Sequence, residues 1–303
     1  MRVKILGSAA GGGFPQWNCG CANCMRVRGL RGSSDARTQA QAALTADEKS
    51  WYLLGASPDL RQQILATPEL APAAGERGSP IVGVFLTSAD IDAVFGLLHL
   101  REFHPLHIYS TSGVRRILFE SNSVFRALDR SKPPAQWREI RPGEETALGD
   151  SGMSCTPVAL ESAYPDYVGE LLRRSLAPNQ ATIGLAIEHG GKKLFFAPGL
   201  PGASSAWKAE AAASDLALLD STFWSDDELV AIRGGGKTAR EMGHPPLSGT
   251  GGLIEQMRRE ARPRKVAIHI NNTNPILNDE SPECREMRDA GWEIATDGME
   301  FVL

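Results

Sequence analysis

The chain has 303 residues, of which 42% are apolar and 22% are charged, and its formal net charge is −4. This composition is typical of a soluble globular protein, and the charge balance gives no reason to expect nucleic acid or an anionic membrane surface as a partner. No apolar stretch reaches the roughly 20 residues of a membrane span. The first apolar segment meets glycines before a signal-peptide core can form, so we expect a cytoplasmic protein.

The N-terminal segment is predicted to be a strand, Met1–Leu6, followed by the glycine-rich loop Gly7–Gly13. The loop lacks the lysine and the glycine spacing of phosphate-binding motifs, so it is a weak signal for a nucleotide. Three cysteines then follow in a C-x-C-x-x-C pattern, at Cys19, Cys21 and Cys24. Thiolates held this close are suited to one tetrahedral Zn²⁺. We therefore predict a structural zinc loop over about residues 7–25, with a fourth ligand from elsewhere in the chain or from water.

The other two cysteines, Cys155 and Cys284, stand alone and are expected to be buried small hydrophobic residues. Five cysteines are an odd number, which argues against a disulfide framework. Downstream of the zinc loop, Arg37–Leu44 and Trp51–Leu54 are predicted to pair as strands. A helix is expected up to Ala66, with Ser57 as its N-cap and Pro58 at its first position.

A strand, a polar loop and a helix are predicted between Ile81 and Leu100. The apolar run Ile81–Leu86 is typical of a buried strand, and apolar residues recur at helical spacing after Asp92. Ligands collect at the carboxyl ends of strands in α/β sheets. Asp90 and Asp92 could therefore aim two oxygen donors into that crevice. The alternative is that one of them only caps the following helix.

The second half of the chain repeats the alternation of strands and helices. A helix is predicted over Arg115–Leu128, a hairpin over Ala181–Glu188 and Lys193–Ala197, and strands over Asp215–Asp220 and Val266–Ile270. This order predicts an α/β protein, a four-layer αββα sandwich, in one domain spanning residues 1–303.

Further candidate residues follow from this arrangement. Asp220 is the last residue of one predicted strand, and His269 lies on another. Both are therefore predicted to bind a metal together with Asp92. His244 follows the glycine-rich stretch Gly234–Thr238 and is predicted to be either a surface residue or a catalytic base facing the substrate. The remaining histidines are expected to have structural roles: His99, His104, His107 and His189.

The Asp90 loop resembles the T-H-x-H-x-D-H motif of metallo-β-lactamase-fold hydrolases. In this frame only Asp92 keeps the hydrolase residue, while Ser88, Asp90 and Ala93 stand where three histidines would be. The motif is therefore either damaged or adapted to another metal.

Longer stretches resemble the coenzyme PQQ synthesis protein B family, in order from Gly7 to Leu277. They include LGSAAGGGFPQWNC, the cysteine cluster, ASPDLRQQ, GLLHLRE, LLDSTFW, TAREMGH and HINNTNPIL. The resemblance implies the metallo-β-lactamase fold, a structural zinc at the cysteines, and a role in making pyrroloquinoline quinone. It further implies an iron-dependent oxygenase step that hydroxylates the tyrosine-derived ring of a cross-linked Glu–Tyr precursor.

Carried over residue by residue, the resemblance implies iron ligands at Asp92, Asp220 and His269, with Asp90 nearby as a catalytic residue. The family's usual histidine is Ala93 here. Because oxygen-activating iron typically takes two imidazoles and a carboxylate, His244 is the first candidate to replace the missing ligand. In related phosphodiesterases the fourth zinc ligand comes three residues after the strand histidine, which corresponds to Asn272.

The expected substrate is a polyanionic quinone precursor, so Arg37, Arg101 and Arg240 are candidates for binding its carboxylates; ordinary salt bridges are the alternative for each. Other pathway proteins and a homodimer are left open as partners. Three functions are open as well: the iron oxygenase, a metal-dependent hydrolase of the same fold, and a non-catalytic carrier or transport protein for the quinone or its precursor.

Overall fold

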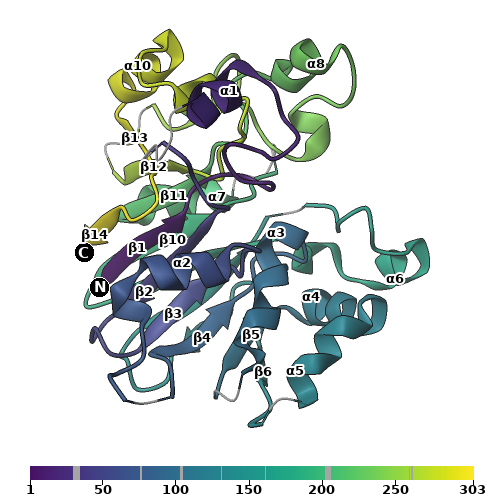
Figure 1. Cartoon of the computed structure of the whole chain (residues 1–303), viewed down its shortest axis with the longest axis vertical. Helices are drawn as coiled ribbons and strands as arrows, with labels where there is room; N and C mark the ends of the chain where they lie inside the picture. The colour runs from purple at the N-terminus through teal and green to yellow at the C-terminus, as the bar shows by residue number, and fades with distance from the viewer. Residues whose placement is uncertain are drawn as a thin grey trace.

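Two seven-stranded β-sheets form the framework of the part of the chain that the structure describes (Figure 1). The computed structural model describes residues 1–29, 35–75, 77–102, 105–130, 132–160, 162–201, 206–258, 260 and 262–303. The first sheet contains, in spatial order, β14 (Glu300–Val302), β1 (Arg2–Gly7), β2 (Gln41–Thr45), β3 (Trp51–Leu54), β4 (Ile81–Phe85), β5 (His107–Ser110) and β6 (Gln136–Glu139). The second contains β13 (Trp292–Ile294), β12 (Arg264–Ile268), β11 (Leu216–Asp220), β10 (Lys192–Ala197), β9 (Ile183–His189), β8 (Ser154–Ala159) and β7 (Thr146–Ala147).

Short helices cover the outer faces of these sheets (Figure 1). The α-helices are α1 (Ala22–Gly29), α2 (Leu60–Ala66), α3 (Ile91–Val94), α4 (Ser112–Arg116), α5 (Ala127–Arg130), α6 (Glu170–Ser175), α7 (Ala206–Ala213), α8 (Glu228–Arg233), α9 (Leu253–Gln256) and α10 (Pro282–Asp289). The 3₁₀ turns are η1 (Pro68–Leu70), η2 (Phe95–Arg101), η4 (Ser123–Arg126), η5 (Pro178–Gln180), η6 (Arg240–Met242) and η7 (Pro275–Leu277), and η3 (Ile117–Ser121) is a π-helical turn.

Three hydrophobic cores separate four layers. One lies between the sheets and combines side chains such as Leu54 of the first sheet and Leu218 of the second. A second core packs α2 to α5 on the first sheet, and a third packs α1, α7 and α10 on the second. The predicted αββα sandwich is therefore confirmed.

The strand β11 illustrates why continuous apolar runs predicted the central strands. Leu216 and Leu218 point into the core between the sheets, while Ala217 and Leu219 point into the core under the helices. Because both faces of such a strand are buried, its sequence is apolar throughout instead of alternating. The predicted hairpin is likewise confirmed by the antiparallel pairing of β9 and β10.

Two predicted helix features were wrong in detail, and the alternative capping role of Asp90 is not observed. Helix α2 begins at Leu60 with Asp59 at its N-cap position, because the Ser57 hydroxyl donates to Gln63 instead, at 3.0 Å. The carboxylate of Asp90 makes no capping bond to α3. The helix predicted over Arg115–Leu128 is interrupted at Asn122, whose side-chain amide donates to the carbonyl of Ile117 at 3.2 Å and competes with the helical pattern.

The strand β12 lies two residues earlier in the chain than the predicted Val266–Ile270, since it ends at Ile268 and leaves His269 just outside it. His269 adopts a φ of +60°, which non-glycine residues rarely do. The chain leaves the sheet at this point because Ile270 pairs with Ala9 and donates to the carbonyl of Ser8 at 3.0 Å. Among the helices of the described residues, none has the length and apolarity to cross a membrane.

Candidate metal centre

The ends of three strands deliver the carboxylates and one imidazole of the candidate centre. Parallel pairing of β11 and β12 sets Asp220 beside Ile268, so His269 follows at the same edge. Asp92 comes from α3, which follows the loop after β4 of the other sheet. Asp92 Oδ2 lies 3.0 Å from His269 Nε2, and Asp220 Oδ1 lies 3.7 Å from His269 Nδ1. The centre thus lies where the two sheets meet.

A second imidazole comes from His244, in the loop after η6. Its Nδ1 lies 2.6 Å from Asp220 Oδ2, and its ring is nearly parallel to that of His269 at a centroid distance of 5.4 Å. Its amide donates to the carbonyl of Ala239 at 2.9 Å. Asp220, His244 and His269 each offer one ligand atom within 4.8 Å of the others. His244 therefore lies at the same site as Asp220 and His269, the two residues for which the sequence predicted a shared metal.

Asp220 is completely buried and its oxygens are held by fixed donors. Oδ1 accepts from the hydroxyl and the amide of Thr222, at 2.6 and 3.1 Å, and Oδ2 accepts from the amide of Leu200 at 3.0 Å. Burial by itself would raise the pKa of Asp220, but the charges and hydrogen bonds of His244 and His269 outweigh it and hold that pKa well below its usual range. Asp220 is consequently a fixed anion that requires a nearby cation.

His269 supplies that cation in the protein without metal. Burial acts to lower the pKa of His269, but hydrogen bonds to Asp220 and Asp92 outweigh burial and raise it to about 10. The imidazole is then protonated at neutral pH. A metal ion that binds here must displace this proton and would take over its charge.

Asp90 lies beside this cluster and has a different environment. Its carboxylate accepts from the Ser88 hydroxyl at 2.7 Å. The residue as a whole is exposed, yet its carboxyl group lies close to protein atoms. Desolvation of that carboxyl, followed by the charge of Asp92, raises the pKa of Asp90. Asp90 is therefore the carboxyl group of this site most ready to take up a proton.

Two segments that the sequence analysis did not assign to the centre approach it closely. Tyr167 donates to the carbonyl of Ala89, and burial together with the charge of Asp90 raises the pKa of its phenol to about 12. The backbone at Gly11 approaches Asp92 so closely that a Cβ there would lie 3.2 Å from Oδ2. The glycine-rich loop therefore serves close packing against the centre.

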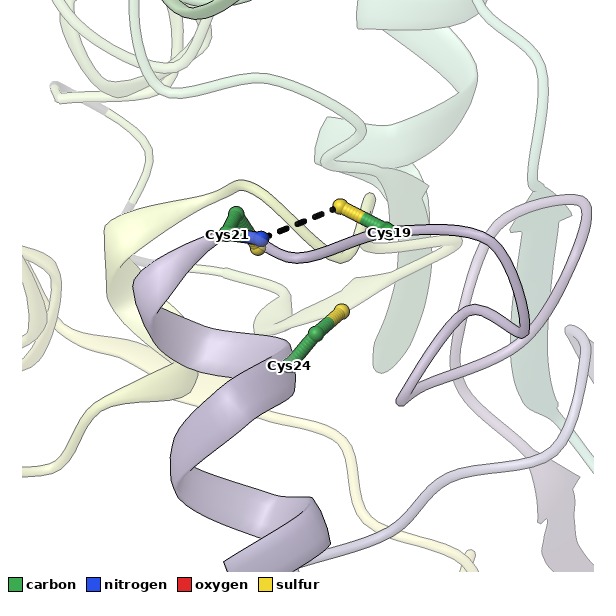
Figure 2. A group of neighbouring side chains, drawn as sticks. All are labelled: Cys19, Cys21 and Cys24. Atoms are coloured by element: carbon green, nitrogen blue, oxygen red, sulfur yellow. Dashed lines mark hydrogen bonds between the residues drawn. The ribbon is translucent and has the colours of Figure 1, made fainter.

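The three cysteines form a second cluster, about the first turn of α1 (Figure 2). Cys24 points from the helix toward the preceding loop, which carries Cys19, and the amide of Cys21 donates to Cys19 Sγ at 3.5 Å. The side-chain nitrogen of Asn272 reaches all three sulfurs, at 3.0 Å from Cys19, 3.6 Å from Cys21 and 3.3 Å from Cys24. Asn272 thus lies over the open side of the thiol tripod.

Comparison with known proteins identifies the family. Residues 50–270 match the family model of the beta-lactamase superfamily domain. The full chain is 41% identical to coenzyme PQQ synthesis protein B of Gluconacetobacter diazotrophicus and 42% identical to that of Gluconobacter oxydans, and it covers 99% of each. The chain belongs to the coenzyme PQQ synthesis protein B family. The crystal structure of Zn²⁺-bound PqqB from Methylobacterium extorquens matches it with a TM-score of 0.91 at 37% identity, over the whole of both chains.

The chain offers donor sets that fit two kinds of metal. Three thiols in one loop fit zinc, and burial raises the pKa of the Cys24 thiol to about 11, so zinc would displace its proton. Two imidazoles with a carboxylate fit Fe²⁺. His269 and His244 keep 15% and 23% of their side-chain surfaces exposed, so this centre has an open side.

The three arginines lie in different surroundings. The guanidinium of Arg37 donates to the carbonyl of Ala295 and faces Asp297, so it is engaged near the C-terminus. Arg101 lines a hollow of about 850 Å³ together with Arg126, Arg130 and Lys132. Arg240 is in η6, four residues before His244, and donates to the carbonyl of Thr250 at 3.0 Å. Of the three, Arg240 is nearest in sequence to a residue of the centre.

Among the histidines expected to be structural, His99 is exposed on η2 and His104 lies outside the described residues. Thr222 was not predicted from the sequence as part of the centre, yet its one hydroxyl contacts Asp220, His244 and His269. Its position two residues after the strand-end Asp220 was the available signal, because a hydroxyl so placed can fold back on the carboxylate.

Replacing Cys21 with serine is expected to release zinc and to lower the melting temperature by several degrees. A hydroxyl is a poor zinc ligand, so the variant loses the crosslink that zinc gives to the cysteine loop. Zinc content by elemental analysis and thermal unfolding would measure both effects. Cys284→Ser is the control, since this buried thiol lies outside the cluster; an unchanged zinc content in Cys21→Ser would refute the assignment.

Proposed function

We propose that this chain acts in coenzyme PQQ synthesis as a non-haem iron oxygenase that hydroxylates the tyrosine-derived ring of a Glu–Tyr precursor. Its membership of the PQQ synthesis protein B family supports the pathway. The observation that carries the reaction class is the meeting of His244, His269 and Asp220 at one point with an open side. Two imidazoles and one carboxylate are the donor set typical of Fe²⁺ oxygenases.

In this proposal Asp220, His244 and His269 hold the iron. Asp92 contacts the His269 imidazole and so lies beside the metal site. Iron bound there would supply the activation of O₂ toward the ring. His244 supplies the second imidazole in this proposal, in place of the family's usual histidine at position 93. Its direct contact with buried Asp220 favours this assignment over the role of a free base.

Proton handling then falls to Asp90, which borders the centre and has a raised pKa. As the carboxylate it accepts the proton of a substrate phenol, which makes the ring more electron-rich. Tyr167 holds the backbone before Asp90 through the carbonyl of Ala89. Arg240, on the element that leads to His244, is the candidate for binding a substrate carboxylate.

Metal analysis of the purified protein tests the proposal. We expect about one iron per chain beside the cysteine-bound zinc, and oxygen consumption that depends on a tyrosine-containing precursor. Two zinc ions beyond the cysteine site would indicate the hydrolase that is common in this fold. Zinc at the cysteines alone would indicate a carrier of the quinone or its precursor, and would refute the oxygenase.

A further inference from the structure

The two candidate metal sites share one short turn. His269 belongs to the Asp220 centre, and Asn272, three residues later, covers the three thiols. Between them the chain can adjust at only two residues, Ile270 and Asn271. A displacement of Asn272 must therefore also displace His269, and the reverse.

The turn is clamped on both sides. On the cysteine side, the amide of Asn23 in α1 donates to the carbonyls of Asn272 and Asn274, at 3.2 and 3.0 Å. On the other side, Asn274 donates to the carbonyls of Ser221 and Thr222, at 3.0 and 3.3 Å, directly after Asp220. The cysteine loop, the turn and the end of β11 thus form one hydrogen-bonded unit.

The backbone of His269 requires this support. A φ of +60° is costly for a histidine and persists only where the surroundings over-determine it. Before the turn, the Thr222 hydroxyl, which donates to Asp220, lies 2.8 Å from Nδ1 of His269. After it, the conformation depends on the turn that Asn23 and Asn272 attach to the cysteine loop.

We propose that the cysteine loop positions His269 through Asn272 and Asn23, so that zinc at the cysteines and a metal ion at the Asp220 centre strengthen each other's binding. The inference rests on the proposed function in that it requires the Asp220 centre to bind a metal. Zinc orders the thiols, the thiols fix Asn272, and the turn then holds His269 in its ligand geometry. Asn272 and Asn23 are positioning residues in this scheme.

Such a coupling is reciprocal: if zinc raises the affinity of the second site, a metal at the second site raises the affinity for zinc by the same factor. Typical couplings between sites are about fivefold to 150-fold. Since only one of the ligands is positioned by the turn, we expect about tenfold here. Full loss of binding is not expected, because Asp220 and His244 are held by other contacts.

The test uses the full chain and Mn²⁺ as the probe of the Asp220 centre, because this ion prefers oxygen and imidazole ligands to thiolates. The Mn²⁺ affinity is measured by electron paramagnetic resonance on zinc-loaded and zinc-free protein. We expect zinc-loaded wild type to bind Mn²⁺ about tenfold more tightly. Asn272→Ala and Asn23→Ala should each bring this ratio close to one.

Asn179→Ala, an exposed asparagine in η5, is the matched control and should leave the ratio unchanged. Equal Mn²⁺ affinities of folded wild-type protein with and without zinc would overturn the coupling, even if a variant failed to fold. Absence of Mn²⁺ binding in both states of wild type would overturn the proposed metal centre itself. Reciprocity adds a check, since saturating Mn²⁺ should tighten zinc binding by the same factor in a chelator competition.

Discussion

His244→Ala is expected to weaken Fe²⁺ binding at the Asp220 centre by at least about 100-fold, because loss of an outer hydrogen-bond partner alone costs about 10–100-fold and His244 is a direct ligand in our assignment. The buried Asp220 carboxylate would also lose one of its two closest partners, the imidazole at 2.6 Å. Anaerobic titration with Fe²⁺, followed by oxygen consumption, measures the effect. Both the affinity and the activity should fall together.

Two further variants sharpen this result. His99→Ala removes an exposed histidine of η2 and should leave Fe²⁺ binding unchanged. Ala93→His restores the family's usual imidazole and should tighten binding, but by less than His244→Ala weakens it, because a second imidazole is already present in the wild type. Full retention of iron by His244→Ala would instead exclude His244 as a ligand and return it to the role of a base.

Glu228→Gln is expected to stabilise the protein above neutral pH by about 3 kcal/mol. Glu228 is buried at the start of α8, where its carboxylate accepts from the amide of Trp224 at 2.6 Å and from the hydroxyl of Thr273 at 2.5 Å. Burial raises its pKa from 4.5 to about 7, and the two hydrogen bonds offset only part of this effect. Above pH 7 the wild type therefore carries a buried charge that forms no salt bridge within the described part of the chain.

The sign of the pH dependence follows from proton binding. Between pH 4.5 and about 7 the native state keeps the proton of Glu228 and the unfolded state has lost it, so stability falls as the pH rises through this window. Glutamine mimics the protonated acid and removes that loss. Urea unfolding at roughly pH 5 and pH 8 should show little difference at the lower pH and a stabilised variant at the higher one.

Glu286→Gln is the control for this measurement, since Glu286 is an exposed residue of α10. The same stabilisation in Glu286→Gln would point to a general charge effect in a chain of net charge −4. A Glu228→Gln variant that is less stable at both pH values would show that the charged form of Glu228 is the stabilising one.

The local features of this protein could be predicted from its sequence. Apolar runs such as Leu216–Leu219 and Ile81–Leu86 predicted buried strands because burial of both faces leaves no room for alternation. The cysteine spacing predicted a zinc loop because three thiols in six residues cannot lie far apart. The family resemblance supplied the fold, which the matched structure confirms. The extent of the single domain, residues 1–303, stays a prediction.

Only the tertiary structure decided which distant residues meet. His244 lies on no strand, and its contact with Asp220 depends on the path of the loop after η6. The β11–β12 register sets Asp220 beside His269, and the contact between Asn272 and the cysteines depends on how α1 packs on the second sheet. Periodicity and spacing describe neighbours along the chain, whereas these contacts join segments 24 to 253 residues apart. Packing of the layers, which no local pattern encodes, therefore determines the centre.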